Sequence, residues 1–254
     1  MEDLADRWGR DYAQISRVTN ELAHFIDDEW AFLLADMSRF TPDDLERFVS
    51  ATIHAGCPAN DIALFLDATF EEVTEPTDDQ RAMYSGYLKG HAYKWQGVAA
   101  PDGLIVLCHG PIEGRRADGK LLEMSGLPDD LVAHCKGYGG RQLFVYADPA
   151  YIGEAEVVLT GLKKLANLTQ AERDFNSLMA KLRQSVEWAF GKVKNNWAFL
   201  KFEDDLKIHL SPVAVYFRVG VLLTNGHTCL YSSEISKCFK CPPPSLHEYF
   251  KKRM

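Results

Sequence analysis

The feature that most constrains this chain is a short apolar run that ends in a carboxylate. Residues 63–66 read Ala-Leu-Phe-Leu, and Asp67 follows directly. A continuous apolar run of this length predicts a buried central strand. A carboxylate in such a strand is costly to bury unless a cation or hydrogen-bond donors meet it. Asp67 is therefore either a buried hydrogen-bond acceptor, which is the commoner case, or a metal ligand.

Composition predicts an ordinary globular protein. The chain has 254 residues, of which 46% are hydrophobic, enough for one large domain or for one domain and a small one. No apolar run reaches the roughly 18 residues of a membrane-spanning helix, so no membrane segment is predicted. The six cysteines are scattered, which favours a reducing compartment over a disulfide framework.

Charge is distributed unevenly along the chain. Residues 1–80 carry five Lys and Arg against 19 Asp and Glu, whereas residues 81–254 carry 23 against 17. The basic remainder permits contact with nucleic acid. The net charge of −8 predicts that the molecule alone binds DNA weakly, because non-specific affinity comes from cationic contacts to phosphates.

The first part of the chain is predicted to be helical. Apolar residues recur at helical spacing through residues 1–57, and Thr41 is a good N-cap. Residues 3–25 could be the last two helices of a helix-turn-helix, although two helices that pack on a core explain the pattern better. We assign residues 1–60 to an acidic helical region, which would be a remnant of a helix-turn-helix with linking helices, and residues 61–254 to a second domain.

The second domain is predicted to alternate strands and helices. Residues 93–99 and 104–108 are expected to form a hairpin around a Pro-Asp-Gly turn, and residues 71–79 an acidic turn. Loops, helices and a short strand are expected further on: a loop at 110–116, helices at 121–125, 128–135, 169–200, 207–231 and 245–250, and a strand at 157–160.

The pattern of an apolar strand followed by an aspartate occurs a second time. Residues 142–147 read Gln-Leu-Phe-Val-Tyr-Ala, Asp148 follows, and Pro149 ends the strand because it cannot donate to a ladder. Alternation of strand and helix predicts parallel pairing, which would place Asp67 and Asp148 side by side near the carboxyl ends of their strands. Taken alone, Asp148 is more typical of a helix N-cap or a turn.

The long predicted helix carries a polar stripe beside its apolar one, made of Asn176, Ala180, Arg183, Glu187 and Gly191. Arg183 and Glu187 lie one turn apart and share a face. One interpretation is a surface ion pair of little energetic weight. The other is that Glu187 faces the two aspartates while Arg183 faces a phosphate.

The three carboxylates together predict a hard, all-oxygen site at Asp67, Asp148 and Glu187. Mg²⁺ or Mn²⁺ suits such a site, since these ions take one or two carboxylates together with substrate phosphates. With two ions about 3.5–4 Å apart, one ion activates the attacking oxygen and the other stabilises the leaving oxygen. The predicted chemistry is cleavage or transfer of a phosphodiester, with catalysis by positioning and charge neutralisation.

A cationic segment that also holds aromatic residues follows the first predicted strand. Its composition is equally compatible with a solvated loop and with a surface that binds phosphates. The candidate DNA-binding residues are Lys89, His91 and Lys94 of this segment, Arg115 and Arg116 of the later loop, and Arg183.

Two close pairs of potential zinc ligands lie near the end of the chain, at His227, Cys229, Cys238 and Cys241. A single CxxC with an HxC is a weaker signal than paired CxxC motifs, and these residues lie beside apolar ones. Reduced thiols in or near the core are therefore favoured over a structural zinc site.

Several short motifs occur in a fixed order between about residue 4 and residue 250. They include Phe65-Leu66-Asp67-Ala68-Thr69, Lys89-Gly90-His91, Gly114-Arg115-Arg116, Ala147-Asp148-Pro149-Ala150-Tyr151, Val186-Glu187-Trp188-Ala189-Phe190-Gly191 and Leu222-Leu223-Thr224-Asn225. In these motifs the chain resembles the DDE nuclease domain of Harbinger-type transposases and of host proteins derived from them.

The resemblance implies a ribonuclease H-like α/β fold, with a mixed sheet of about five strands flanked by helices after an N-terminal helical region. It implies a metal-dependent DNA endonuclease whose three acids fall on Asp67, Asp148 and Glu187, with Mg²⁺ or Mn²⁺ as cofactor. It also implies that a separate Myb-like partner protein shares DNA targeting. We therefore expect a nuclear protein, or a cytoplasmic one in the absence of that partner.

Two departures from the family pattern bear on activity. Ala68 stands where the family usually has Gly, and Ala117 stands where the family has the His of a His-Asp pair. The set of three acids is nevertheless complete. The alternative to an active nuclease is a catalytically silent host protein that keeps the fold as a DNA- or protein-interaction module.

Overall fold

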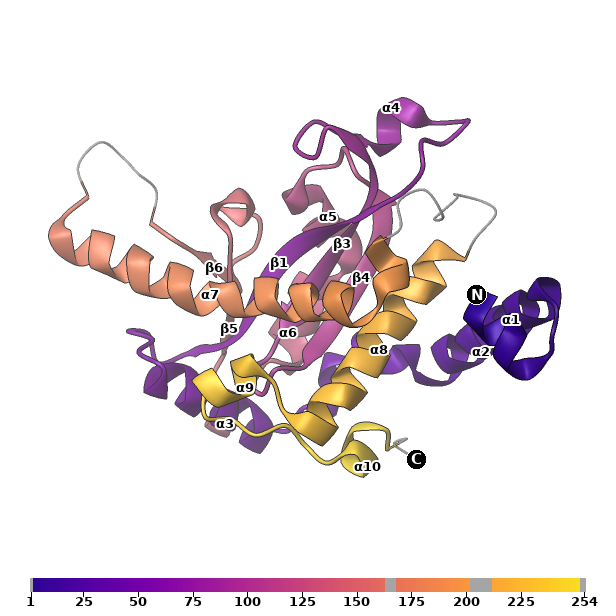
Figure 1. Ribbon diagram of the computed structural model, residues 1–254. Helices are drawn as coiled ribbons and strands as arrows, with labels where there is room; N and C mark the ends of the chain where they lie inside the picture. The colour runs from indigo at the N-terminus through magenta and orange to yellow at the C-terminus, as the bar shows by residue number, and fades with distance from the viewer. Residues whose placement is uncertain (1, 163–167, 202–211, 252–254) are drawn as a thin grey trace.

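A mixed sheet forms the centre of the molecule (Figure 1). The computed structural model describes residues 2–162, 168–201 and 212–251. Over these residues the sheet has six strands in the order β4-β3-β1-β5-β6, with the short β2 also paired to β3. The strands are β1 (Ile62–Glu72), β2 (Tyr84–Ser85), β3 (Gly90–Ala99), β4 (Ile105–Glu113), β5 (Phe144–Ala147) and β6 (Val158–Thr160).

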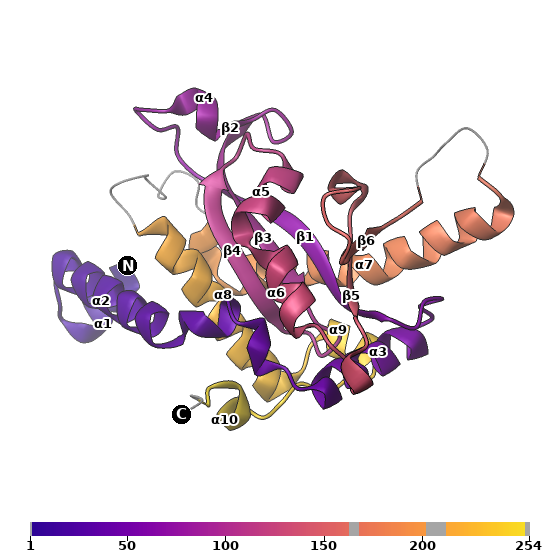
Figure 2. The same cartoon turned by 180° about the vertical axis from the view of Figure 1, so that it is seen from behind.

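Helices cover both faces of this sheet. Two long helices, α7 and α8, lie against the face seen in Figure 1, and α5 and α6 cover the face seen in Figure 2. The α-helices of the described residues are α1 (Glu2–Trp8), α2 (Tyr12–Trp30), α3 (Pro42–His54), α4 (Gln80–Met83), α5 (Asp118–Ser125), α6 (Leu127–His134), α7 (Gln170–Asn196), α8 (Val213–Tyr231), α9 (Glu234–Cys238) and α10 (Leu246–Tyr249). The expected fold class, a helix-flanked mixed sheet with an N-terminal helical region, is confirmed.

The central strand is β1, as the apolar run predicted. Residues 62–66 are almost completely buried. β1 pairs in parallel with β5 and antiparallel with β3, so that Leu66 faces Ala147 on one side and Asp67 faces Gly97 on the other. The hairpin of β3 and β4 and the short β6 also lie where they were expected.

The strand that carries Asp67 is longer than the sequence predicted. β1 continues past Asp67 to Glu72, because β3 remains its partner as far as the pair Glu72–Ala92. Asp67 is therefore in the middle of a strand, and the expectation that it ends one is wrong. The expected acidic turn starts too early for the same reason, since Glu71 is buried in β1 and its Oε2 accepts a 2.8 Å hydrogen bond from Trp95 Nε1. The first half of the expected loop at 110–116 likewise belongs to β4.

The helix boundaries follow their capping residues. Thr41 caps α3 and Thr169 caps α7, each in a capping box with the acid three residues later. α7 ends at Asn196, four residues earlier than expected, and a 3₁₀ segment covers Ala198–Lys201. Residues 207–211 of the helix expected at 207–231 lie outside the described residues. None of the described helices is long and apolar enough to cross a bilayer.

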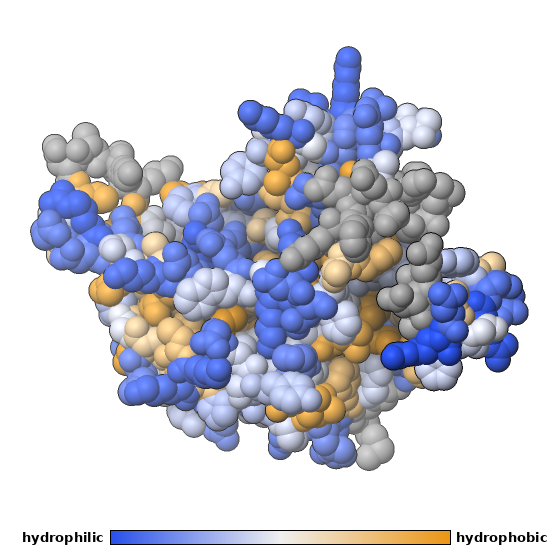
Figure 3. Space-filling model, viewed as in Figure 1, coloured by the Kyte–Doolittle hydropathy of each residue, from blue (hydrophilic) through white to orange (hydrophobic). Residues whose placement is uncertain are grey.

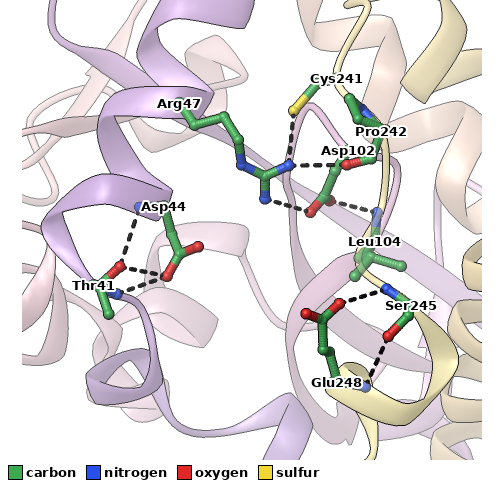
Figure 4. Close-up of polar contacts among 9 residues, drawn as sticks. All are labelled: Thr41, Asp44, Arg47, Asp102, Leu104, Cys241, Pro242, Ser245 and Glu248. Atoms are coloured by element: carbon green, nitrogen blue, oxygen red, sulfur yellow. Dashed lines mark hydrogen bonds and ion pairs between the residues drawn. The ribbon is translucent and has the colours of Figure 1, made fainter.

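One corner of the fold connects three parts of the chain that are far apart in sequence (Figure 4). Arg47 of α3 forms an ion pair of 3.5 Å with Asp102, in the turn between β3 and β4. The same guanidinium donates a 2.9 Å hydrogen bond to the carbonyl oxygen of Pro242 near the C-terminus. Phe48, the next residue of α3, is fully buried in the core that also holds β1. The N-terminal helices and the sheet therefore share one core.

Candidate active site

The parallel pair of β1 and β5 brings two aspartates to the same place. Leu66 of β1 pairs with Ala147 of β5, and the next residue in each strand direction is an aspartate. Asp148 accepts a 2.9 Å hydrogen bond from the Ala150 N–H as the N-cap of a 3₁₀ segment. Asp67 accepts one of 2.8 Å from the Ala68 N–H. The two interpretations of Asp148 are thus compatible, because it caps a turn and also lies next to Asp67.

Helix α7 lies against β1 and β3 and supplies two further side chains. A glycine allows this close approach: a Cβ on Gly97, the partner of Asp67 in β3, would be 2.2 Å from Phe190 Cζ. Phe190 follows Glu187 by three residues and shares its side of α7. The position of Phe190 over Gly97 therefore sets how near Arg183 and Glu187 come to the sheet.

Arg183 forms ion pairs with all three of the candidate acids. Its Nη1 is in close contact with Asp67 Oδ2, and its Nη2 is 3.0 Å from Glu187 Oε1 and 3.6 Å from Asp148 Oδ2. Only 17% of the Arg183 side chain and 16% of the Asp67 side chain are exposed, whereas half of Glu187 is exposed. The four residues, from three elements far apart in sequence, therefore form one cluster at the surface of the sheet.

The cluster has more negative than positive charge. One guanidinium faces three carboxylates, which leaves an excess of two negative charges when all three are ionised. The pKa of Asp67 is raised to about 6, chiefly by burial and to a lesser extent by the nearby Asp148 and Glu187, although Arg183 and the Ala68 N–H oppose the shift. An additional cation would relieve this repulsion.

The donor atoms of the cluster fit a hard divalent cation. Carboxylate oxygens are the ligands that Mg²⁺ and Mn²⁺ prefer. In the described residues, however, no three His, Cys, Asp or Glu side chains are arranged closely enough to hold a metal ion. The guanidinium of Arg183 makes the contacts with the three carboxylates that such a cation would make. The oxygen ligands and the negative charge of the cluster therefore suit a divalent metal ion, although Arg183 lies among the carboxylates.

The structure separates the candidate DNA-binding residues into different settings. Lys94 is only 7% exposed, and its Nζ donates to the Arg116 carbonyl oxygen at 2.6 Å and to Asp118 at 2.8 Å. Arg116 is exposed and pairs with Glu113 at 2.8 Å. The Lys94 ammonium is thus used inside the protein, where it holds the segment after β4.

Two other candidates, His91 and Arg115, line the same cavity of about 570 Å³. Arg81 and Tyr84 also line it, and Lys89 is exposed nearby in sequence. The cavity lies beyond Glu72, at the end of β1 next to α4 (Figure 1). The structure therefore brings Arg81 and His91, from the segment after β1, together with Arg115, from the segment after β4, in a pocket that Glu75 also lines and that is separate from the acid cluster.

The cysteine-containing segment does not form a metal site in the part of the chain that the structure describes. Cys241 is buried and 3.5 Å from Arg47 Nη1, whereas Cys238 is exposed. Burial raises the pKa of Cys229 to about 12, so this thiol stays protonated near neutral pH. The interpretation of these residues as reduced thiols stays a prediction.

A groove that the sequence did not predict has Glu187 in its lining. Trp188, Gly191 and Lys192 of α7 line one side of it, and residues from the end of α8 and from α9 line the other. A tryptophan directly after a candidate catalytic acid, Trp188 after Glu187, was the one hint in the sequence. A helical pattern alone does not show which residues face a groove.

A family model for the DDE superfamily endonucleases matches residues 66–225. This span is more than half of the chain and contains all three acids together with Arg183. The protein belongs to this family. Comparisons with curated proteins and with solved structures give no match.

Proposed function

We propose that this protein is a divalent-metal-dependent DNA endonuclease of the Harbinger type, in which Asp67, Asp148 and Glu187 hold Mg²⁺ or Mn²⁺. The observation that carries the proposal is the convergence of these three carboxylates on Arg183. Membership of the DDE endonuclease family supports the class of reaction. The bound metal supplies charge neutralisation and activation of an oxygen nucleophile at a DNA phosphodiester, for hydrolysis or strand transfer by two metal ions.

The three acids differ in how firmly the fold holds them in place. Asp67 is fixed within a strand that is paired on both sides, and Asp148 is held by the Ala150 N–H. Glu187 is on a long helix and is the most exposed of the three. Asp67 and Asp148 therefore provide the rigid part of the ligand set, while Glu187 closes it on the side from which DNA approaches.

Arg183 acts as the internal counter-cation of the metal-free cluster. If Asp67, Asp148 and Glu187 held a metal ion, the ion would replace Arg183 as their counter-charge, and the guanidinium would then be available to bind a phosphate of DNA. Arg183 would thus have both of the roles that its spacing from Glu187 allowed. It would orient a metal ligand in the absence of metal and contact a phosphate afterwards. A guanidinium suits the second role because it binds phosphate through two parallel hydrogen bonds.

The cationic cavity next to α4 provides a second contact for the DNA backbone. Asp67 and Glu72 are five residues apart on β1, which corresponds to roughly 17 Å along a strand. That distance spans about five nucleotides of duplex at roughly 3.4 Å per nucleotide of one strand. Arg81, His91 and Arg115 then hold phosphates away from the cleaved bond, and a Myb-like partner in the nucleus supplies the sequence-specific contacts.

Nicking of a supercoiled plasmid by the full chain tests the proposal. The wild type is expected to nick in Mn²⁺ or Mg²⁺ and not in EDTA, and Asp148→Ala is expected to abolish nicking. Asp129→Ala, which changes an exposed acid of α6, is the matched control and should nick like the wild type. Absence of metal-dependent nicking by the wild type would contradict the proposal.

The second candidate is a catalytically silent DNA- or protein-interaction module. It is favoured by the contacts of Arg183, which fill the place of a metal, and by Ala117 in place of a family histidine. A silent module would bind DNA without nicking it, and its thermal melt would not respond to millimolar Mg²⁺ or Mn²⁺. An active site would be stabilised by either ion, since the ion binds the folded state.

A further inference from the structure

A groove of about 980 Å³ starts at Glu187 and follows α7 away from the acid cluster. Trp188, Gly191 and Lys192 line it on α7, and His227, Tyr231 and Ser232 line it at the end of α8. Helices α7 and α9, which line it, both lie on the face seen in Figure 1, and hydrophilic side chains cover much of that face in Figure 3. Because Glu187 belongs to both, the groove is continuous with the acid cluster.

Aromatic side chains are exposed along this groove. Trp188 is 49% exposed and Tyr231 is 69% exposed. The ring of His227 lies 4.8 Å from that of Tyr231, between centroids, and is also exposed. Single exposed aromatic residues are common, but three that line one groove next to a candidate active site provide flat surfaces for a planar ligand.

Gly191 has no packing reason for its place in α7, five residues before the helix ends. A Cβ built on it would meet no atom within 4 Å, and its φ is helical, since it is absent from the residues with positive φ. Glycine disfavours a helix relative to alanine. Its effect here is to leave the backbone of α7 open at the floor of the groove, one turn after Glu187.

Ser232 has a backbone conformation that residues other than glycine rarely adopt. Its φ is 62° and its ψ is −177° at the C-terminus of α8. Lys192 Nζ donates to the Ser232 carbonyl oxygen at 3.3 Å and to Thr228 Oγ1 at 2.8 Å. Such strain persists only where the surroundings fix it, and it is concentrated at functional sites.

The charges of the groove are balanced. Lys237 pairs with Glu234 at 2.8 Å, and the lining holds one further cation, Lys192, and one further acid, Glu187. The groove therefore does not attract a phosphate backbone by net charge, unlike the cavity next to α4. Stacking on aromatic faces depends little on the identity of the base, because every base has a π-face.

We propose that this groove binds unpaired bases of the DNA strand that passes the acid cluster, with Trp188 and Tyr231 as the stacking surfaces. The inference rests on the proposed function for the kind of substrate. It adds a site for single-stranded DNA beside the bond to be cut, and it implies that the duplex is locally opened there.

The test measures binding of a fluorescent single-stranded oligonucleotide by anisotropy, with the full chain in EDTA. Trp188→Ala and Tyr231→Ala are each expected to weaken this binding by roughly tenfold, because one stacked base is lost. Trp188→Phe should retain most of the affinity. Trp8→Ala and Tyr138→Ala remove other exposed aromatic residues and should leave binding unchanged.

A substitution that fills the groove provides an independent variant. Gly191→Gln introduces a side chain where no atom lies within 4 Å and a residue that favours helix. It should leave the melting temperature equal or higher while weakening single-strand binding by at least tenfold. Trp188→Ala, Tyr231→Ala and Gly191→Gln should each weaken binding to a blunt duplex much less than binding to the single strand.

The outcomes separate this inference from the proposed function. Equal affinity of wild type, Trp188→Ala and Gly191→Gln for single strands would overturn the groove site, even if the wild type nicks DNA. Loss of affinity in both variants, with no nicking by the wild type, would support the groove and overturn the endonuclease proposal.

Discussion

Two arginines on the long helices contact carboxylates in very different ways. Arg218 of α8 pairs with the single carboxylate of Asp27 on α2, with Nε 2.8 Å from Oδ1 and Nη2 in close contact with Oδ2. Arg183 of α7 faces the carboxylates of Asp67, Asp148 and Glu187. The first pair is balanced in charge and makes two parallel hydrogen bonds, so it joins two helices without requiring another ion. The second is unbalanced, which is the arrangement expected where another cation binds.

The largest expected difference between the two clusters concerns activity. Asp67→Asn should reduce metal-dependent nicking by at least roughly 10³-fold, equivalent to about 4 kcal/mol, because one of the three proposed metal ligands is lost. Asp27→Asn should leave the nicking rate unchanged at temperatures where the variant is folded. Plasmid nicking at saturating Mn²⁺ measures both, and an Asp67→Asn variant within tenfold of the wild type would break the comparison.

The second difference concerns stability. Arg218→Met should lower the free energy of unfolding by about 3–5 kcal/mol, because Asp27 remains buried without its counter-ion. Millimolar Mg²⁺ should not restore it. Urea denaturation in EDTA and in Mg²⁺ measures the effect. Recovery of much of the stability by the double variant Asp27→Asn with Arg218→Met would attribute the loss to the unpaired charge.

The third prediction concerns the distance between α7 and the sheet. Gly97→Ala should destabilise the fold by about 1–3 kcal/mol, because the new Cβ would overlap Phe190. It should also reduce the stabilisation by Mn²⁺, since Glu187 moves away from Asp67. Phe190→Leu in the same chain should recover part of both. A Gly97→Ala protein with a normal melt and a normal Mn²⁺ response would show that this contact does not position α7.

Glu71 extends the comparison to a buried carboxyl whose hydrogen bond comes from an indole. Burial raises its pKa to about 8 from the ordinary 4.5, so the folded protein keeps a proton that the unfolded chain loses. Stability should fall as the pH rises from about 5 towards 8, with a slope of at most about 1.4 kcal/mol per pH unit. Glu71→Gln should remove this part of the slope in denaturation midpoints measured against pH. An identical slope in wild type and variant would contradict the shift.

The smallest expected effect is that of Arg183 on the metal-free protein. Arg183→Met should destabilise the protein by about 1 kcal/mol in EDTA, because the three acids lose their counter-cation. Mg²⁺ should restore this loss, so the metal-induced stabilisation becomes larger than in the wild type. In an Asp148→Ala background, loss of Arg183 should also reduce the salt slope of DNA binding by about one unit if the released guanidinium contacts phosphate. An unchanged Mg²⁺ response would end the counter-cation role.

The sequence predicted most of the longer elements but neither the short α4, β2 and α9 nor the cluster. The apolar runs before Asp67 and Asp148 identify two buried strands, and their parallel pairing follows from alternation of strands and helices. The extension of β1 to Glu72 was not predictable, because half-buried and acidic residues carry no apolar signal and the pairing with β3 decides the length. The roles of the three acids as metal ligands remain predictions.

Two contacts depend on tertiary structure that no local pattern reveals. Arg183 and Asp67 are 116 residues apart, so the helical spacing could suggest a pair with Glu187 but not a guanidinium shared by three acids. Lys94 looks like a surface cation in the sequence, yet Asp118 and a backbone carbonyl satisfy its charge in a buried place. Lysine side chains are exposed in most cases, and a lysine is buried only where the fold provides a specific partner for its charge.

The corner around Arg47 (Figure 4) determines how the polypeptide can be divided. A fragment that begins at residue 61 lacks both Arg47, which faces the 2%-exposed Asp102, and Phe48, which fills the core under β1. Such a fragment would contain every residue of the family match and would still lack the part of the hydrophobic core that α3 provides. We therefore expect the nuclease region to be inherited, fused and expressed only together with the helices that precede it.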